Sequence, residues 1–286
     1  MFVNQIKNAI KYTKQLRTIT RKFNSKKVNK GVATLIAVND EGWLITCKHV
    51  ALNIVTADKL HGKYLKYKND CASGQYDISQ LNKKYGYKES SICQLKNQFF
   101  NVFTGKASGF NVHFHDTLDI ALIKIDGDIK MLCSNYPVFS SKNVESGQYL
   151  CKLGFPFAEF TCIEYDSAKD DIGFTETGTV QSPYFPLDGM VTRRIADKGK
   201  IIGFEMSTPG IKGQSGGPIF DRDNIIWGMQ YQTRHLDLDF KMIKKIDRPE
   251  GVESSEEYAF MNVGLGISSV ELINFMNKFN VKHHSI

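Results

Sequence analysis

The stretch GVATLIAVNDEGWLITCKHV, residues 31–50, decides the fold. Residues 31–38 and 43–50 are rich in Val, Ile, Leu, Thr and Trp, which β-strands favour. Between them, the sequence NDEG has the residue types of a tight turn. The stretch therefore predicts a β-hairpin, and it places His49 at the end of the second strand.

Short runs of the same kind continue along the chain and are separated by turn residues. Many short strands with few helical patterns between them are typical of a β-barrel or a sandwich, so we predict an all-β protein. One late helix is predicted over residues 269–280, with Ser268 or Ser269 as its cap. The further predicted strands are 110–115, 119–125, 148–155, 178–182, 200–206, 218–220, 224–232 and 258–267.

Two stretches do not fit this pattern. Residues 55–109 are rich in Lys, Tyr and Asn with weak periodicity, and we interpret them as an insertion in the first β unit. Residues 233–257 are strongly charged, and we expect a surface loop there.

The net charge of +7 belongs to the N-terminus. Residues 1–30 hold nine Lys or Arg and no acid, whereas the rest of the chain has 28 basic and 30 acidic residues. Within this arm, apolar residues recur at roughly helical spacing: Val3, Ile6, Ile10, Leu16, Ile19 and Phe23. We expect an amphipathic helix in residues 1–28. It packs on the body, or it binds a membrane surface or an acidic partner, or it is an organellar transit peptide.

The sequence also indicates the cellular compartment of the protein. It has no apolar run of about 18 residues and no apolar core after the first lysines, so neither a transmembrane span nor a secretory signal is predicted. The six cysteines are spread without a C-x-x-C pair, which favours free thiols over a zinc site. We therefore expect a cytoplasmic protein.

Ser215 lies in the glycine-rich stretch GQSGGP, residues 213–218, which alone could be an ordinary turn. A serine nucleophile needs a histidine base that a carboxylate orients. His49 ends a predicted strand, and Asp119 opens the apolar run DIALIKI, where a charge is costly to bury without a partner. Asp116 is the alternative carboxylate, but it fits a loop better.

Other histidines have weaker claims. His113 and His115 alternate on one face of a predicted strand, but no third residue with suitable spacing completes a metal site. We therefore predict no metal and no cofactor.

The chain resembles the chymotrypsin-fold serine peptidases, closest in style to the high-temperature-requirement (Deg/HtrA) and bacterial trypsin-like group. The resemblance spans roughly residues 31–280. Its motifs occur in the family's order: GVATLIAVNDEGWLITCKHV, DTLDIALIKI, SGQYLCKLGFPF, GQSGGPIF and VGLGISSVELI. The order His, Asp, Ser along the chain is the one this fold uses.

The resemblance implies two six-stranded antiparallel Greek-key barrels between an N-terminal basic helix and a C-terminal helix. The first barrel covers residues 29–145 with His49 and Asp119, and the second covers residues 146–286 with Ser215. About 20 residues follow Gly266, so no PDZ domain is expected.

The resemblance also implies roles for single residues. Ser215 attacks the scissile carbonyl, His49 takes and returns its proton, and Asp119 holds the imidazole. The N–H groups of Gly213 and Ser215 form the oxyanion hole, which explains the glycine.

Substrate-binding positions follow from the same match. Pro209 stands where trypsin-like members keep a specificity carboxylate, so cleavage after Arg or Lys is not implied. The strand Gln230, Tyr231, Gln232 and Thr233 should lie along the substrate. Gln214 replaces the aspartate with which many digestive members capture a newly cut N-terminus, so zymogen activation of that type is not expected.

The sequence thus predicts a serine endopeptidase acting on a protein or peptide substrate, regulated through loop ordering or the N-terminal arm. A role in bacterial defence or stress is a narrower hypothesis. The alternatives are a non-catalytic scaffold that keeps the barrels, and a protein recruited to membranes or nucleic acid by its basic arm.

Overall fold

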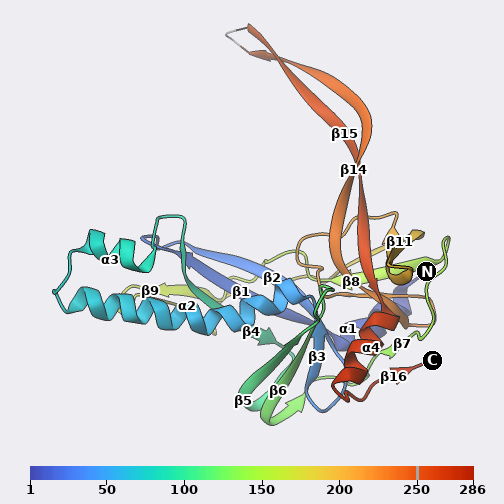
Figure 1. The fold of residues 1–286 in the computed structure, drawn as a ribbon, viewed down its shortest axis with the longest axis horizontal. Coiled ribbons are helices and arrows are strands. Elements are labelled where there is room, and N and C mark those ends of the chain that lie inside the picture. The colour runs from blue at the N-terminus through green and yellow to red at the C-terminus, as the bar shows by residue number, and fades with distance from the viewer. Residues whose placement is uncertain (249–250) are drawn as a thin grey trace.

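The computed structural model describes residues 1–248 and 251–286, and two antiparallel sheets form its body (Figure 1). The first sheet has six strands in the order β4-β1-β2-β3-β6-β5. Its strands are β1 (Thr13–Lys22), β2 (Val28–Ala37), β3 (Trp43–Thr46), β4 (Ile92–Phe100), β5 (Phe103–Phe114) and β6 (Ala121–Met131). The predicted hairpin is confirmed, because Ile36 on β2 pairs with Ile45 on β3.

The second sheet closes into a ring of six strands. Its successive neighbours are β13, β8, β11, β12, β15 and β14, and an additional pairing joins β13 to β14. The strands are β8 (Tyr149–Gly154), β11 (Phe185–Asp197), β12 (Lys200–Met206), β13 (Pro218–Phe220), β14 (Ile225–Arg248) and β15 (Gly251–Ser268). The short strands β7 (Val138–Phe139) and β16 (His284–Ser285) extend it by parallel pairs. The predicted all-β class, with two antiparallel sheets, is therefore confirmed.

Two short strands and a C-terminal helix lie outside these two sheets. The strands β9 (Ile163–Asp166) and β10 (Asp171–Phe174) form a separate antiparallel pair. The predicted C-terminal helix is present as α4 (Ser269–Lys278), and the Ser268 hydroxyl accepts a hydrogen bond from the Val270 N–H as its cap. The strand predicted over 178–182 was wrong, because these residues form no strand.

The N-terminal arm is only partly helical. The helix α1 (Val3–Tyr12) ends after ten residues, and the chain continues directly into β1. The prediction of one helix through Phe23 was therefore wrong. β1 is rich in β-branched residues and pairs with β2 on one side and β4 on the other, and this pairing overrides the helical spacing. The first sheet thus begins at Thr13, before the predicted boundary at residue 29.

Several basic residues of this arm are buried rather than displayed. The Arg17 guanidinium lies 3.3 Å from the centroid of the Phe100 ring, and only 1% of Arg17 is exposed. Arg21 is 3% exposed and pairs with Asp170 at 2.9 Å. The Lys14 ammonium donates to the Leu132 carbonyl at 2.6 Å. These three cations stabilise the body, so they are not available to a membrane or nucleic acid.

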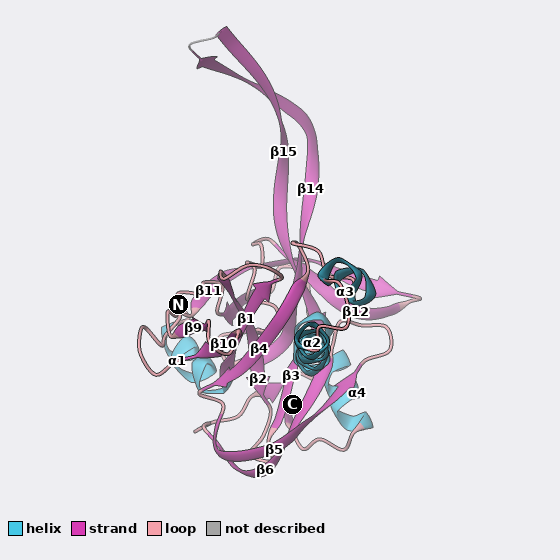
Figure 2. Ribbon diagram, turned by 90° about the vertical axis from the view of Figure 1, so that its left-hand side faces the viewer, coloured by secondary structure: helices cyan, strands magenta, loops and turns pink. Residues whose placement is uncertain are grey.

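The predicted insertion is smaller than expected. Only the helices lie outside the first sheet, namely the part of α2 (Lys48–Ala72) from residue 55 onward and α3 (Ile78–Tyr85). The rest of the predicted insertion includes β4 and the start of β5, and both strands belong to the first sheet. The two helices extend to one side of the body (Figures 1 and 2). They are held by a separate buried cluster of Phe23, Tyr64, Tyr67, Leu81, Tyr87 and Cys93.

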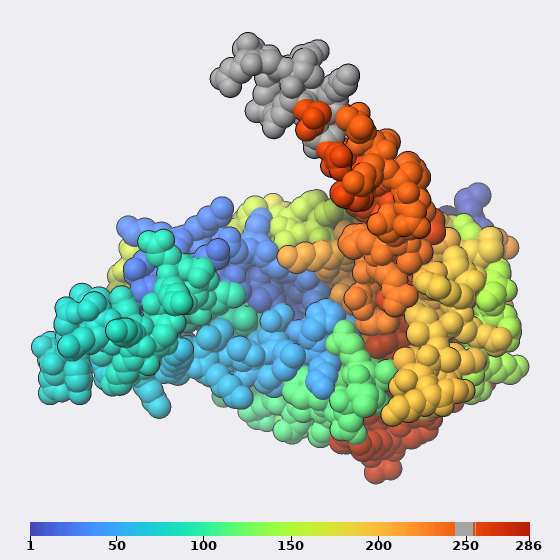
Figure 3. Space-filling model, turned by 45° about the horizontal axis from the view of Figure 1, so that its top comes forward, coloured from blue at the N-terminus to red at the C-terminus, as the bar shows by residue number. Residues whose placement is uncertain are grey.

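The surface loop predicted over residues 233–257 was wrong, because β14 and β15 continue as a long hairpin. Their pairing runs from Gly228 with Ser268 to Arg248 with Gly251. Residues 249–250, which fall within the predicted loop, lie outside the described residues. The hairpin stands clear of the body (Figure 3). Its alternation of charged and apolar residues, in DLDFKMI for example, is a strand pattern that its high charge concealed.

Candidate active site

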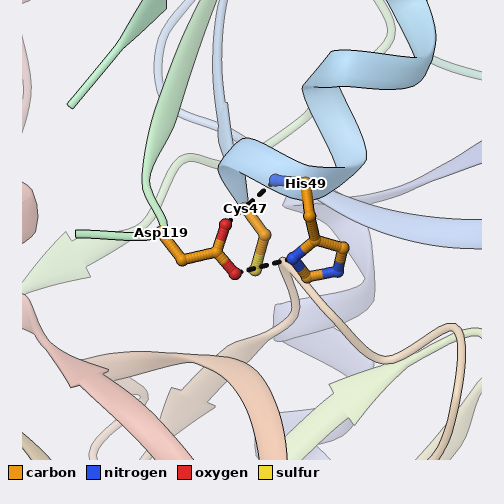
Figure 4. A group of neighbouring side chains, drawn as sticks. All are labelled: Cys47, His49 and Asp119. Carbon is orange, nitrogen blue, oxygen red and sulfur yellow. Dashed lines mark hydrogen bonds and ion pairs between the residues drawn. The ribbon is translucent and has the colours of Figure 1, made fainter. Parts of the chain in front are cut away.

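His49 and Asp119 form a close pair (Figure 4), at the place in the first sheet where β3 ends and β6 begins. The His49 Nδ1 atom lies 2.6 Å from Asp119 Oδ2, and the His49 backbone N–H donates to Asp119 Oδ1 at 2.9 Å. Both carboxylate oxygens are therefore used by one residue. The ring is fixed through Nδ1, which leaves Nε2 as the nitrogen directed at other partners.

The two residues come from neighbouring elements. β3 and β6 pair side by side, with Thr46 opposite Ala121. Asp119 precedes β6, and His49 lies in the first turn of α2 just after β3 rather than on the strand as predicted. The ends of two paired strands thus bring the two side chains together.

The pair is half-open to solvent, since 51% of the His49 side chain and 27% of the Asp119 side chain are exposed. Burial opposes the charge of Asp119, but the hydrogen bonds from the His49 ring and backbone N–H outweigh it. The pKa of the Asp119 carboxyl is therefore lowered from its usual value. Asp119 is ionised at neutral pH and available to stabilise a protonated imidazole.

Cys47 lies beside this pair, and its sulfur is within 4.8 Å of the ligand atoms of His49 and Asp119 (Figure 4). Its thiol is fully buried, donates to the Gln230 carbonyl at 3.4 Å, and has a pKa raised well above the usual value by burial. In this structure the thiol is thus a buried hydrogen-bond donor next to the pair.

The histidines considered for a metal pair have packing roles. The His113 ring lies 4.2 Å from the Phe279 ring, between centroids. His115 Nδ1 accepts the N–H groups of Thr117 and Leu118. Both histidines therefore contribute to the turn and the packing that precede Asp119.

The loop that carries Ser215 adopts backbone angles suited to glycine. Gly213 has φ +103° and Gly216 has φ +87°. A Cβ atom on Gly213 would lie 2.4 Å from the Phe155 carbonyl oxygen, and one on Gly216 would lie 2.0 Å from the Thr34 carbonyl oxygen. The glycines are thus required both by backbone angle and by space.

Thr34 on β2 joins this loop to the first sheet. Its N–H donates to the Ser215 carbonyl at 3.1 Å, and its hydroxyl donates to the Gly213 carbonyl at 2.8 Å. Gly216 N–H in turn donates to the Gln230 carbonyl at 2.8 Å. Sequence reasoning missed Thr34; its one signal was a polar residue in the middle of a strand that is otherwise apolar.

Two backbone donors in the loop stay free. Within residues 1–248 and 251–286, neither the Gly213 N–H nor the Ser215 N–H donates a hydrogen bond to the protein. The intervening Gln214 N–H does donate, to the Ile211 carbonyl, and the Gln214 side chain ties the loop to Ile211 and Phe185. A neutral amide thus orders this loop through hydrogen bonds at the position of Gln214.

A cleft of about 520 Å³ opens beside Ser215. All the predicted substrate-binding residues, Pro209, Gln230, Tyr231, Gln232 and Thr233, line it. The Ser215 hydroxyl donates to the Tyr231 carbonyl at 3.4 Å, a long and weak hydrogen bond. Tyr231 sits at a bulge in β14, where the register with β15 shifts between Gln230 and Gln232. Bulges of this kind often re-aim residues beside active sites.

Comparisons with known proteins bear on the family and the fold of this chain. Residues 33–229 match the trypsin-like peptidase domain family, whereas no curated protein matches the chain. Among solved structures, an HtrA-type protease AlgW carrying a serine-to-alanine substitution, solved with a decapeptide, aligns at 11% identity with a TM-score of 0.50. That alignment covers 98% of this chain and 68% of the other.

Two further structures align over 99% of this chain at 12% identity and a TM-score of 0.49. One is the same HtrA-type protease with a tripeptide, of which this chain spans 64%. The other is a protease from M. tuberculosis in its active form, of which it spans 88%. At such identities the solved structures show the fold alone. The family match covers more than half of the sequence, and the chain therefore belongs to the trypsin-like peptidase domain family, the serine proteases of the chymotrypsin fold.

Proposed function

We propose that this protein is a serine endopeptidase that cleaves peptide bonds through an acyl-enzyme intermediate on Ser215. The observation that carries the proposal is the His49–Asp119 pair, with Nδ1 held at 2.6 Å and Nε2 left to take a proton. The serine loop is tied by Thr34 to the sheet that carries this pair.

In this mechanism His49 removes the proton of the Ser215 hydroxyl as the oxygen attacks the scissile carbonyl. Asp119 stabilises the imidazolium that forms. The free N–H groups of Gly213 and Ser215 are suited to donate to the oxyanion, and one such donor contributes on the order of 3 kcal/mol to transition-state stabilisation. His49 then returns the proton to the leaving amine, and water hydrolyses the acyl-enzyme by the same steps.

The cleft beside Ser215 is suited to bind the side chain that precedes the cleaved bond. The structurally similar HtrA-type protease was solved with a decapeptide, which is consistent with a peptide substrate. Four statements about the protein stay predictions: the division at residue 145, the cytoplasmic location, control through the N-terminal arm, and a role in bacterial defence or stress. No helix in the part of the chain that the structure describes combines the length and apolarity needed to cross a membrane.

A fluorophosphonate probe tests the proposal, because it labels only an activated serine. We expect labelling of the wild type and none of Ser215→Ala or His49→Ala. Ser134→Ala removes an exposed serine and should be labelled like the wild type. An unlabelled but folded wild type, or equal labelling of Ser215→Ala, would contradict the proposal.

A further inference from the structure

A buried lysine lies behind the cleft and has no counter-ion. Lys152 is on β8, is 0% exposed, and donates to the Thr208 carbonyl at 2.6 Å. Among the described residues no carboxylate forms an ion pair with it. A lysine ammonium has three donors, so two of them are without a partner here. A buried cation that is left in this state is costly unless something pairs with it.

The glycines of the cleft show where the ammonium lies. A Cβ atom on Gly264 of β15 would be 2.6 Å from Lys152 Nζ and 3.1 Å from Gln230 Oε1. A Cβ atom on Gly210 would be 2.2 Å from Gln230 Nε2. Gly210 and Gln230 both line the cleft. The Gln230 side chain therefore extends from the cleft lining toward Lys152, whose ammonium is not part of that lining. We call the region beside Gly264, where these two side chains approach each other, the inner end of the cleft.

The polar groups at this inner end are incompletely bonded. Gln230 is 2% exposed, and its Oε1 atom is buried without a hydrogen-bond partner. The buried Thr208 hydroxyl has no partner either. The Gln230 Nε2 atom donates to the Gln232 carbonyl at 2.6 Å, so Oε1 is the unpartnered part of this amide. Buried polar atoms in native proteins are nearly always hydrogen-bonded, so the unpartnered amide oxygen and the partly unpartnered ammonium near it indicate a ligand site.

The charge of the cleft selects the ligand. Its lining includes Lys212 and His235 and no carboxylate. A basic side chain would meet Lys152 as a like charge, and an apolar one would leave the ammonium unpaired. A carboxylate would instead accept a charge-assisted hydrogen bond from Lys152. Gln230 could add one from the second N–H of Nε2, since the first goes to the Gln232 carbonyl.

We propose that this cleft selects an acidic side chain, glutamate before aspartate, at the residue whose peptide bond is cleaved, with Lys152 as the specificity-determining cation and Gln230 positioned to share the carboxylate. The longer glutamate reaches the inner end of the cleft, behind Gln230. The inference rests on the proposed function, because it names the substrate class of the same site.

The selectivity should depend on pH. Burial lowers the pKa of Lys152 to about 7, opposed by the neighbouring Cys151 thiol. Burial raises the pKa of Cys151 itself to about 12, with a further contribution from Asp188. The partners of Lys152 on β11 and β13, Leu187 and Ile219, are not titratable. The ammonium is therefore lost as the pH rises through 7, and the preference for glutamate over glutamine should fall with it.

The proposal is tested with fluorogenic peptides that differ only at the residue before the cleaved bond. Cleavage is compared for Glu, Asp, Gln, Leu and Arg at that position. We expect kcat/KM for Glu to exceed that for Gln by roughly 100-fold at pH 6 in the wild type. The ratio should fall by at least tenfold by pH 8.5. His49 acts on both substrates alike, so it does not contribute to this change in the ratio. In Lys152→Met the ratio should approach one, while in Lys142→Met, an exposed lysine that does not line the cleft, it should change by less than about threefold.

A binding measurement separates this inference from the proposed function. Peptides ending in Glu or Gln are titrated into Ser215→Ala by calorimetry, and tighter binding of the Glu peptide by at least tenfold supports the proposal without any catalysis. Fluorophosphonate labelling with equal kcat/KM for all peptides would overturn the specificity and leave the peptidase intact. If Lys152→Met does not fold, the wild-type pH profile decides, since a ratio that stays flat from pH 6 to 8.5 overturns the proposal.

Discussion

His49 gives both its ring Nδ1 and its backbone N–H to the two oxygens of Asp119, at 2.6 and 2.9 Å. This two-point contact fixes the carboxylate relative to both the ring and the start of α2. One aspartate therefore sets the orientation of the imidazole and the position of the backbone that carries it.

Replacing this carboxylate should nearly abolish catalysis without unfolding the protein. In Asp119→Asn the amide no longer favours the Nδ1–H tautomer, so we expect kcat to fall by about 10⁴-fold. Steady-state cleavage and the rate of fluorophosphonate labelling measure the loss. Asp116→Asn is the matched control, because Asp116 is exposed and pairs only with Lys278 at 3.4 Å. Equal losses in the two variants would contradict the assignment of Asp119.

The same pair predicts a pH dependence of stability. The folded pKa of Asp119 lies below its usual value of 3.8, so its ionised form stabilises the folded state above that pH. This contribution is lost as the pH falls through the lower, folded value. Acid unfolding followed by circular dichroism should show a shallower loss of stability below pH 4 in Asp119→Asn than in the wild type. Identical profiles would show that the contacts with His49 do not stabilise the charged form.

Gly213 should tolerate no side chain. Gly213→Ala places a Cβ atom 2.4 Å from the Phe155 carbonyl oxygen at a φ of +103°, so the loop must shift. If its N–H serves the oxyanion, kcat should fall by about 10²-fold or more. Gly147→Ala is the control, since Gly147 has φ +90° but nothing within 4 Å of the added atom. Gly147→Ala should lose about 1 kcal/mol of stability and keep its activity. A fully active Gly213→Ala enzyme would exclude the oxyanion role.

Substituting Arg21 tests whether the basic arm contributes to the stability of the body. Arg21→Met removes the partner of Asp170 and hydrogen bonds to Gln94 and Tyr64. We expect the free energy of unfolding to fall by about 3 kcal/mol in denaturant titrations. Lys22→Met, at the exposed neighbouring position, should change it by less than about 0.5 kcal/mol. A similar small effect for both variants would mean that the Arg21 contacts contribute little.

The sequence predicted the parts of the fold that depend on local patterns. The hairpin around residues 31–50 and the C-terminal helix were found because their alternation, turn residues and cap are local signals. β1 was missed because its strand identity comes from pairing with β2 and β4, which its own helical spacing does not show. The β14–β15 hairpin was missed because a charged strand that projects into solvent resembles a loop in composition.

The candidate site likewise has residues that the sequence predicted and one that it did not. His49, Asp119 and Ser215 were predicted by motif, and the positions 209 and 230–233 by their offsets from the serine. Lys152 carried the same signal as Asp119, a charge inside an apolar run, in QYLCKLGF. It was passed over because nothing in the sequence shows that Gly264 and Gln230, about 80 to 110 residues later, lie beside its ammonium.

The β14–β15 hairpin connects the cleft to a surface far from it. β14 lines the cleft at residues 230–233 and continues to Arg248, which at about 3.3 Å per residue is roughly 50 Å of strand. Exposed apolar side chains lie along both strands, among them Phe240, Met242, Tyr258 and Phe260. A molecule bound along these exposed side chains would leave the cleft open, yet it would contact the same strand, β14, that lines the cleft at residues 230–233.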